Sequence, residues 1–242
     1  MPGPVIDLNA DVGERPGADG IAADAQIIAA CSSLNVACGF HAGDAATMRA
    51  VCAEATLRHK RIGAHVSYLD REGFGRRDLD VDPTELCQLV VQQIAALRIE
   101  AGLEHGHVGY VKPHGALYNR AAVDRVYADA IVSAIAAVDR DLKLLAPPDS
   151  EMRRSAEAEG IEGVAEGFAD RAYRADGTLV PRGDPGAVLA APDAVVAHAE
   201  ELAKTGRFRS LCLHSDTPGA AELALAIRNR LIGAGFEIRP FA

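Results

Sequence analysis

Four of the eight histidines stand where a strand-like apolar run has just ended. They are His41, His65, His114 and His214. Neutral imidazole can ligate a metal or act as a general base near neutral pH, and carboxylates complete either arrangement. One such histidine is usually structural, but four at equivalent positions favour a shared site.

These histidines and the nearby carboxylates permit a divalent metal site. Its candidate ligands are Asp11, His41, His65 and Glu166. The spacing carries no recognised signature, because HExxH is absent and no two of the four histidines lie three or four residues apart. The sequence therefore permits metal binding without indicating it.

A cluster of acidic and amide side chains ends the first strand-like run, in the segment DLNADVGE (7–14). Alternate side chains of an extended chain share a face, so Asp7, Asn9 and Asp11 point the same way. Such groups are costly to bury unless they are paired or bound to a cation. The pattern favours a ligand or cation site over acids that cap the following turn.

Lys112 ends another strand-like run and opens the segment KPHGALYN (112–119). A lysine at the inner end of a barrel strand needs an anionic partner. That partner is either a bound phosphate or carboxylate ligand, or the side chain of Asp11 or Glu166 in a salt bridge. The sequence favours neither alternative. In the same segment, Asn119 either caps a helix or binds substrate.

Two long, glycine-marked segments are more typical of binding loops than of simple connections. One runs from Ser67 to Arg77, and the other follows Glu166 and includes Arg171 and Arg182. Guanidinium groups can hold a carboxylate or a phosphate through two parallel hydrogen bonds. The sequence lacks GxxxxGK[ST] and GxSxG, which excludes a Walker-type ATP site and the common serine-hydrolase elbow.

The elements that position these residues alternate along the whole chain. Asp82 and Pro83 are typical of a helix start, and Asp44 suits an N-cap and a catalytic role equally. The predicted strands cover residues 5–9, 34–38, 61–65, 108–112, 143–146, 163–166 and 210–214, with 236–239 as an eighth. No linker-like stretch interrupts the alternation, so residues 1–242 are predicted to form a single α/β domain.

The positions of the polar residues discriminate between an open sheet and a closed barrel. In an open sheet they gather at one switch point, whereas each strand of a barrel can contribute a side chain to a common mouth. Here polar residues follow at least six of the predicted strands. We therefore predict a (β/α)7-like, irregular TIM-type barrel.

Composition excludes several classes of protein. The 242 residues include 25 basic and 34 acidic side chains, a net charge of −9, and 49% of them are hydrophobic. The apolar share excludes a disordered chain, and the scattered basic residues argue against a nucleic-acid partner. No membrane-length apolar run or signal peptide is evident, and the five cysteines form no CxxC pair. We expect a cytoplasmic protein that binds neither nucleic acid nor membrane.

Five segments resemble motifs of the LamB/YcsF family, in the family's order and over nearly the whole chain. They are DLNADVGE (7–14), NVACGFHAGD (35–44), AHVSY (from residue 64), KPHGALYN (112–119) and EGFADRAY (166–173). The resemblance implies a (β/α)7 barrel related in architecture to carbohydrate deacetylases. It also implies cleavage of the lactam 5-oxo-L-proline to L-glutamate, with hydrolysis of ATP to ADP and phosphate. The resemblance implies that the chain is the A component of a 5-oxoprolinase that also contains subunits B and C.

Three positions depart from the family's motifs. Val66 and Leu69 stand where prolines are common, and Ser215 stands where the family usually has HGD. The first two bear on the conformation of a loop, and Ser215 bears on the role of His214 and Asp216.

The implied reaction assigns roles to the candidate residues. With ATP as co-substrate, phosphorylation of the amide oxygen would turn it into a leaving group, and the site then needs cations, a base and dipoles. The catalytic candidates are Asp11, His41, Lys112, His114 and Glu166. The candidates for binding substrate or phosphate are Asn9, Glu14, His65, Asn119, Arg171, Arg182, His214 and Asp216.

Two other functions fit the same residues. The first is a stand-alone, metal-dependent deacetylase or amidase that needs no ATP. The second is a noncatalytic lactam-binding component of a complex, which the missing P-loop keeps open because the nucleotide could bind to a different chain.

Overall fold

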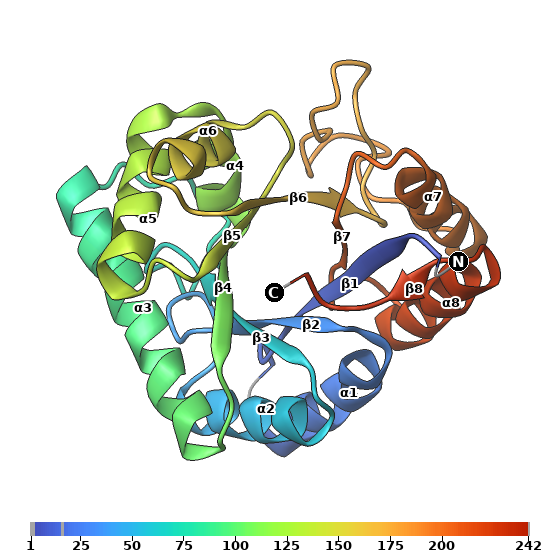
Figure 1. Cartoon of the computed structure of the whole chain (residues 1–242), viewed down its shortest axis with the longest axis horizontal. Helices are drawn as coiled ribbons and strands as arrows, with labels where there is room; N and C mark the ends of the chain where they lie inside the picture. Colours follow the sequence, from blue (N-terminus) through green and yellow to red (C-terminus); the bar gives the residue numbers. More distant parts are fainter. Residues whose placement is uncertain (1–2, 16, 242) are drawn as a thin grey trace.

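A closed barrel of parallel strands forms the centre of the molecule (Figure 1), which confirms the predicted fold class. The computed structural model describes residues 3–15 and 17–241. Within them the barrel strands are β1 Val5–Val12, β2 Ser33–Ala37, β3 Arg61–Val66, β4 Val108–Pro113, β5 Lys143–Ala146, β6 Gly163–Phe168 and β7 Ser210–Leu213. Because β1 pairs with both β7 and β2, the described strands close a ring of seven.

The ends of β1 differ from the prediction in ways that matter for the site. β1 continues to Val12 instead of ending at Asn9, so Asp11 belongs to the strand itself. At its other end, Val5 and Ile6 pair with the short strand β8 (Glu237–Ile238), which lies outside the closed ring. The predicted eighth strand is therefore present but takes no part in closing the barrel.

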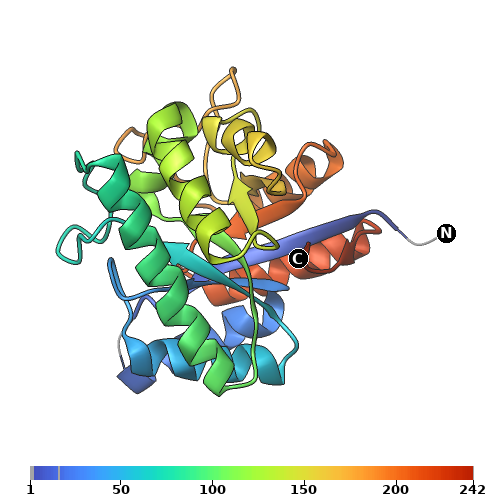
Figure 2. The same cartoon turned by 60° about the vertical axis from the view of Figure 1, so that its left-hand side comes forward.

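Helices cover the outside of the barrel (Figures 1 and 2). They are α1 Gly17–Ala30, α2 Ala45–Leu57, α3 Pro83–Leu103, α4 Gly115–Val123, α5 Arg125–Val138, α6 Glu151–Ala158, α7 Pro192–Lys204 and α8 Ala220–Gly233. Asp44 is the N-cap of α2, where its carboxylate accepts a hydrogen bond from the N–H of Thr47 at 2.8 Å. Asp124 caps α5, whereas Asn119 lies inside α4, so of the two roles considered for Asn119 helix capping is wrong.

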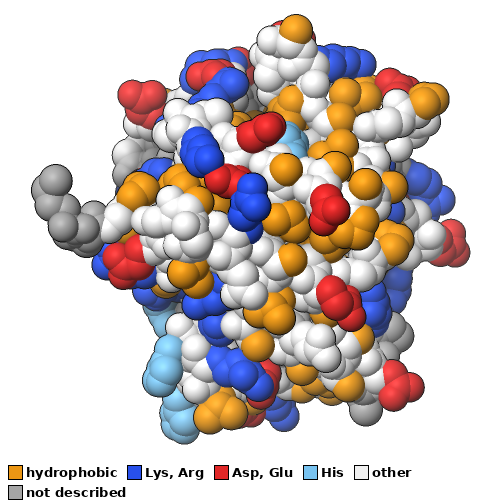
Figure 3. Space-filling view, turned by 90° about the vertical axis from the view of Figure 1, so that its right-hand side faces the viewer, with side chains coloured by type: hydrophobic (Ala, Val, Ile, Leu, Met, Phe, Trp, Pro, Cys, Tyr) orange, Lys and Arg blue, Asp and Glu red, His pale blue; other side chains and the backbone are white. Residues whose placement is uncertain are grey.

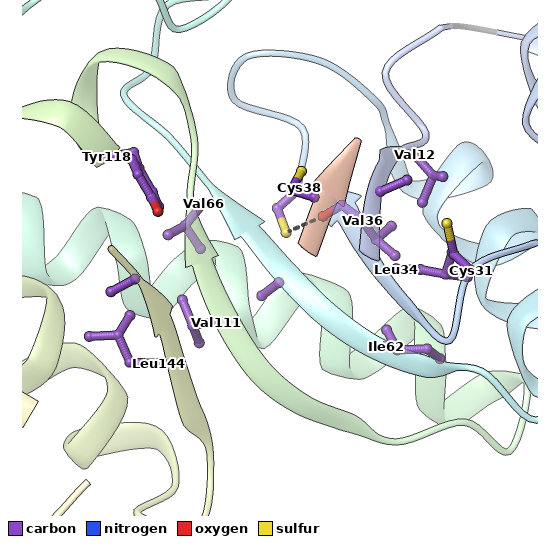
Figure 4. Packing of buried hydrophobic residues seen from close by; sticks show 14 of the residues in the cluster. Val12, Cys31, Leu34, Val36, Cys38, Ile62, Val66, Val111, Tyr118 and Leu144 are labelled. Carbon is purple, nitrogen blue, oxygen red and sulfur yellow. Dashed lines mark hydrogen bonds between the residues drawn. The ribbon is translucent and has the colours of Figure 1, made fainter. Parts of the chain in front are cut away.

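The outward face of each barrel strand packs against the helices. In this layer the side chains of Leu34, Val36, Ile62, Val111 and Leu144 are buried (Figure 4). The intervening residues of each strand point into the lumen, because side chains alternate across a strand. The helices thus take up the apolar faces, and the polar residues of the sequence motifs are left to line the interior.

α3 is the one helix of the described chain that is long and apolar enough to cross a membrane by length and composition alone. Its Leu86, Val90, Ile94 and Leu97 are fully buried, and the helix packs beside α2 and α5. The barrel core therefore accounts for the apolar composition of this helix.

The surface around α7 and α8 carries mixed charge. Basic, acidic and apolar side chains are interspersed on this face (Figure 3). Side chains of both signs thus lie near one another on the face that this view shows.

The C-terminal residues cover the end of the barrel at which the strands begin (Figure 1). Tyr110, Leu145 and Val164 form a small apolar layer, and the ring of Phe241 packs against it, 4.9 Å from the ring of Tyr110. Lys143 at the start of β5 donates a hydrogen bond to the backbone oxygen of Phe241 at 2.8 Å. The main cavity opens at the opposite end, where the strands finish and the polar residues gather.

Candidate active site

Polar side chains form layers inside the lumen, and Asp7 belongs to the deepest of them. Its carboxylate accepts hydrogen bonds from the hydroxyls of Ser32 and Ser33, each at 2.6 Å, and of Ser210. Burial raises the pKa of Asp7 to about 6, although the three hydrogen bonds lower it. Asp7 thus lies beneath the site as part of the barrel interior.

Two amide side chains connect this layer to the one above. Asn9 Nδ2 donates to Ser210 Oγ at 2.7 Å and to Glu166 Oε1 at 3.1 Å. Asn35 Nδ2 donates to the side-chain oxygen of Asn9 at 2.6 Å and to Asp11 Oδ1 at 2.8 Å. Asn9 is fully buried, and both the nitrogen and the oxygen of its side-chain amide are hydrogen-bonded to other residues.

Lys112 Nζ stands between two carboxylates, 3.1 Å from Asp11 Oδ1 and 3.0 Å from Glu166 Oε1. Burial lowers the pKa of Lys112, but Asp11, Cys212 and Glu166 outweigh burial and raise the pKa well above its ordinary value. Tyr118 donates to the other oxygen of Glu166 at 3.0 Å. Lys112 is therefore charged and forms the salt bridges that the sequence offered as one alternative.

Asp11 connects this ion pair to the histidines. Its Oδ1 lies 3.3 Å from His65 Nε2 as well as beside Lys112. Burial raises the pKa of Asp11, but His65 and Lys112 outweigh burial and bring the pKa well below its usual value. Asp11 is consequently ionised at neutral pH.

Three histidines and Glu14 meet above Asp11, with donor atoms that all lie within 4.8 Å of one another. Glu14 Oε1 is 3.3 Å from His41 Nε2, 3.6 Å from His114 Nδ1 and 3.9 Å from His65 Nε2. The rings of His41 and His114 stack with their centroids 3.9 Å apart. Imidazole nitrogens and a carboxylate oxygen at such separations are the donor types of a transition-metal site.

Burial makes charge unfavourable in this cluster. Burial and the neighbouring His65 lower the pKa of His41 well below its usual value. Burial, His41 and His65 lower the pKa of His114 in the same way. Burial and the charge of Asp11 raise the pKa of Glu14. His41 and His114 are thus neutral bases or ligands at neutral pH.

His214 forms a separate pair with Asp170. Its Nδ1 lies 2.9 Å from Asp170 Oδ1, and the hydroxyl of Thr217 donates to Asp170 Oδ2 at 2.5 Å. Burial lowers the pKa of His214, but the Asp170 carboxylate outweighs it and raises the pKa above its ordinary value. The ring of Phe168 stacks on the imidazole, with the ring centroids 5.2 Å apart, and His214 lines the cavity at the barrel mouth.

A cavity of about 510 Å³ lies at the barrel mouth. Its lining includes Asp11, His65, Lys112, His114, Tyr118, Phe168 and His214. Arg76, Arg120, Arg171 and Arg182 also line it. Arg182 pairs with Asp216 at 2.9 Å, and Arg76 contacts the same carboxylate. Arg171 is buried and donates to two backbone carbonyl oxygens, at 3.2 and 2.6 Å. These cations make the mouth suitable for a small anionic ligand.

Nearly the whole chain matches one family of proteins. A model of the LamB/YcsF family covers residues 6–242. This chain belongs to the LamB/YcsF family.

Relatives of this LamB/YcsF chain include two proteins named as the A subunit of 5-oxoprolinase. The one from Streptomyces avermitilis is 50% identical over 250 residues, which cover 98% of this chain and 100% of the relative. The one from Nocardia farcinica is 46% identical over 248 residues, which cover 98% and 99%. Among solved structures, the lactam utilization protein from Thermus thermophilus superposes with a TM-score of 0.91 at 36% identity, covering 98% of this chain and 100% of that chain.

A more distant likeness concerns the barrel alone. The catalytic domain of a peptidoglycan N-acetylglucosamine deacetylase from Eubacterium rectale superposes with a TM-score of 0.56 at 11% identity, covering 99% of this chain and 89% of that chain. At this identity the likeness concerns the fold, and a shared fold does not imply a shared function. It agrees with the architecture that the sequence motifs predict.

The LamB/YcsF barrel brings most of the predicted site residues to one end. Those at the mouth or directly beneath it are Asp11, Glu14, His41, His65, Lys112, His114, Glu166, Arg171, Arg182 and His214. Asn9 lies deeper, and Asn119 borders the cavity from α4. Asp216 follows His214 in the sequence but pairs with Arg182 and Arg76, whereas the partner of His214 is Asp170.

The three departures from the LamB/YcsF motifs have defined positions. The hydroxyl of Ser215 donates to Glu14 Oε2 at 3.1 Å. Val66 is fully buried at the end of β3, while Leu69 is 65% exposed in the loop that follows. Ser215 therefore acts on Glu14 and not on a pair between His214 and Asp216.

Sequence reasoning missed Asp170 as a member of this LamB/YcsF site, although a signal for it exists. Glu166, Phe168 and Asp170 alternate along the chain as the inward residues of β1 do, and all three are buried. The contact of His114 Nε2 with the backbone oxygen of Phe74, at 2.9 Å, left no comparable signal. A backbone oxygen is present at every residue, so only the folded loop reveals it.

Proposed function

We propose that this chain is the A subunit of an ATP-dependent 5-oxoprolinase, in which it opens the lactam ring of 5-oxo-L-proline to form L-glutamate. One observation carries the proposal. A charged lysine between carboxylates, a histidine–aspartate pair and a buried arginine surround one cavity of about 510 Å³. The names of the relatives described above support the same assignment.

The chemistry requires that a stable amide be activated. Transfer of the γ-phosphoryl group of ATP to the lactam oxygen releases ADP and makes that oxygen a better leaving group. A water then adds to the ring carbon, the carbon–nitrogen bond breaks, and the nitrogen takes up a proton to become the amino group of glutamate. A second water hydrolyses the remaining acyl phosphate, so that one phosphate is released for each ring opened.

Two groups at the cavity are suited to the charges that develop. His214 is the proposed general acid for the ring nitrogen, because Asp170 raises the pKa of His214 and orients its Nδ1. Lys112, held in its charged form, stabilises negative charge that develops on oxygen. The neutral histidines beneath the cavity, with Asp11 beside His65, accept the proton of the attacking water.

Arg171 and Arg182 are proposed to bind the anionic parts of the reactants, either the carboxylate of 5-oxoproline or the transferred phosphoryl group. Burial and the neighbouring Arg182 lower the pKa of Arg171, which indicates that two positive groups face each other at the mouth. An anion between them would relieve that repulsion and satisfy guanidinium N–H donors.

We assign ATP binding to the assembly with subunits B and C, because the sequence has no Walker-type loop. We also place the protein in the cytoplasm. In the described residues all five cysteines are free thiols, which suits a reducing compartment.

The test is to follow the release of glutamate and ADP from 5-oxoproline and ATP, with this chain alone and with subunits B and C. We expect equal amounts of both products only from the complete mixture. His214→Ala should slow glutamate release by about 100-fold or more, while the exposed control His107→Ala should not. Undiminished turnover by both His214→Ala and Lys112→Met would refute the proposal.

The cluster of Glu14 with three histidines favours a second candidate, an ATP-independent, metal-dependent amidase. Glutamate release by this chain alone, without ATP and sensitive to a chelator, would assign that function instead. If ADP release by the complete mixture persisted when the histidines were removed, a noncatalytic lactam-binding role would follow.

A further inference from the structure

Backbone oxygens determine which nitrogens carry the hydrogen in two buried imidazoles, because a carbonyl oxygen only accepts hydrogen bonds. His65 Nδ1 lies 3.1 Å from the backbone oxygen of Lys112, and His114 Nε2 lies 2.9 Å from that of Phe74. Each of these nitrogens therefore carries a hydrogen. In the neutral rings, His65 Nε2 and His114 Nδ1 are left with lone pairs.

These two lone-pair nitrogens face each other at 2.9 Å. With no hydrogen between them they repel, and a positive charge in front of both would turn the repulsion into attraction. A proton and a metal ion both carry such a charge. His65 and His114 are only 1% and 5% exposed, so the contact between these two nitrogens is closed off from water.

Glu14 and His41 bring two further donor atoms to the same point. Glu14 Oε1 is 3.3 Å from His41 Nε2, 3.6 Å from His114 Nδ1 and 3.9 Å from His65 Nε2. Ligand atoms that lie about 2.0–2.1 Å from a tetrahedral metal are about 3.3 Å from one another. The three distances from Glu14 Oε1 lie at or somewhat above that value, and the four donor atoms all lie within 4.8 Å of one another.

The surrounding charge and contacts also suit a dication. Lys112 pairs with Asp11 and Glu166, and Glu14 adds a third carboxylate beside the histidines. A doubly charged cation would offset part of this negative charge. Ser215 donates to the second oxygen of Glu14 at 3.1 Å, which orients the first oxygen toward the histidines.

We propose that Glu14, His41, His65 and His114 form a binding site for one divalent transition-metal ion, with Zn²⁺ as its occupant. Three of the four donors are imidazole nitrogens, which Zn²⁺ accepts and which Mg²⁺ and Ca²⁺ do not prefer. The site does not depend on the reaction proposed above. If both hold, the histidines act as ligands and Asp11 is left to accept the proton of water.

The test uses the purified full chain, stripped with a chelator and titrated with Zn²⁺ by calorimetry. We expect one Zn²⁺ per chain, a rise in the temperature of thermal unfolding, and a tetrahedral visible spectrum when Co²⁺ replaces Zn²⁺. His114→Ala should bind Zn²⁺ at least about 100-fold more weakly. The exposed histidine variant His107→Ala should bind Zn²⁺ as the wild type does.

Ser215→Ala protects the test against misfolding, because it leaves all four donor side chains in place. Removal of the hydrogen bond to Glu14 should weaken Zn²⁺ binding by about tenfold. The proposal is overturned if the folded wild type takes up no Zn²⁺. It is equally overturned if folded His114→Ala binds Zn²⁺ as tightly as the wild type, or if His107→Ala abolishes binding.

Discussion

Asp7→Asn tests how the acid at the base of the lumen affects folding. Burial raises the pKa of Asp7 from 3.8 to about 6 in the folded chain, whereas the unfolded chain keeps the ordinary value. An acid with the higher pKa in the folded state favours folding when it is protonated. The wild type should therefore lose stability as the pH rises from about 4 to about 6, and regain none above that range.

The size of the effect follows from the shift. A rise from 3.8 to about 6 corresponds to a free energy of about 3 kcal/mol, at about 1.36 kcal/mol per pKa unit. Between about pH 5 and about pH 8, the ionisation of Asp7 should lower the free energy of unfolding of the wild type by about 1.4 kcal/mol. Asparagine has the same shape, keeps one oxygen acceptor for the serine hydroxyls and cannot ionise. The stability of Asp7→Asn relative to the wild type should therefore grow by about 1.4 kcal/mol over this range.

Urea unfolding followed by circular dichroism gives the free energy of unfolding of both proteins at each pH. The matched control is Asp141→Asn, which makes the same change at an exposed acid instead of one buried in the lumen. A difference between Asp7→Asn and the wild type that is constant with pH, or that shrinks as the pH rises, would refute the reasoning.

Three further substitutions probe the mouth. Lys112→Met leaves Asp11 and Glu166 without their cation and should lower the free energy of unfolding in urea by about 3–5 kcal/mol. Gly75→Ala places a methyl group 2.9 Å from His114 Cδ2 at a φ of +64°, and should reduce both Zn²⁺ affinity and glutamate release by about tenfold or more. Asp170→Asn removes the charge that raises the pKa of His214, so the alkaline limb of kcat/KM should move to lower pH.

Each of these expectations has a contradicting result. Wild-type stability in Lys112→Met would mean that the buried ion pairs contribute nothing to folding. Gly183→Ala, where a methyl group meets open space, is the control for Gly75→Ala, and equal behaviour of the two would contradict the steric argument. An alkaline limb that does not move in Asp170→Asn would remove His214 from the role of general acid.

Local patterns in the sequence were enough to predict the barrel and the inward face of β1. Asp7, Asn9 and Asp11 share the lumen because side-chain alternation is a property of any extended strand. The sequence likewise predicted an N-cap at Asp44 as one of two roles, the other being catalysis. Capping can be predicted because it depends on residues only three positions apart.

The pairing of groups from distant strands could not be read in this way. Asp170 and His214 are 44 residues apart, and nothing in either segment specifies the other as its partner. His114 acquires its orientation from the oxygen of Phe74, which only the folded loop after β3 brings into place. Asn119 shows the opposite error, because a residue that can cap a helix can also lie within one.

The hydrogen-bonded column inside the barrel restricts how this protein can change in evolution. Interior residues of an apolar core exchange singly for others of similar volume. Here Asp7 is joined through Ser210 to Asn9, and Asn9 through Asn35 to Asp11. An apolar residue at any one position leaves a buried neighbour unpaired, at about 1–3 kcal/mol for each orphaned group. Related barrels should therefore differ along this column at several positions together or at none.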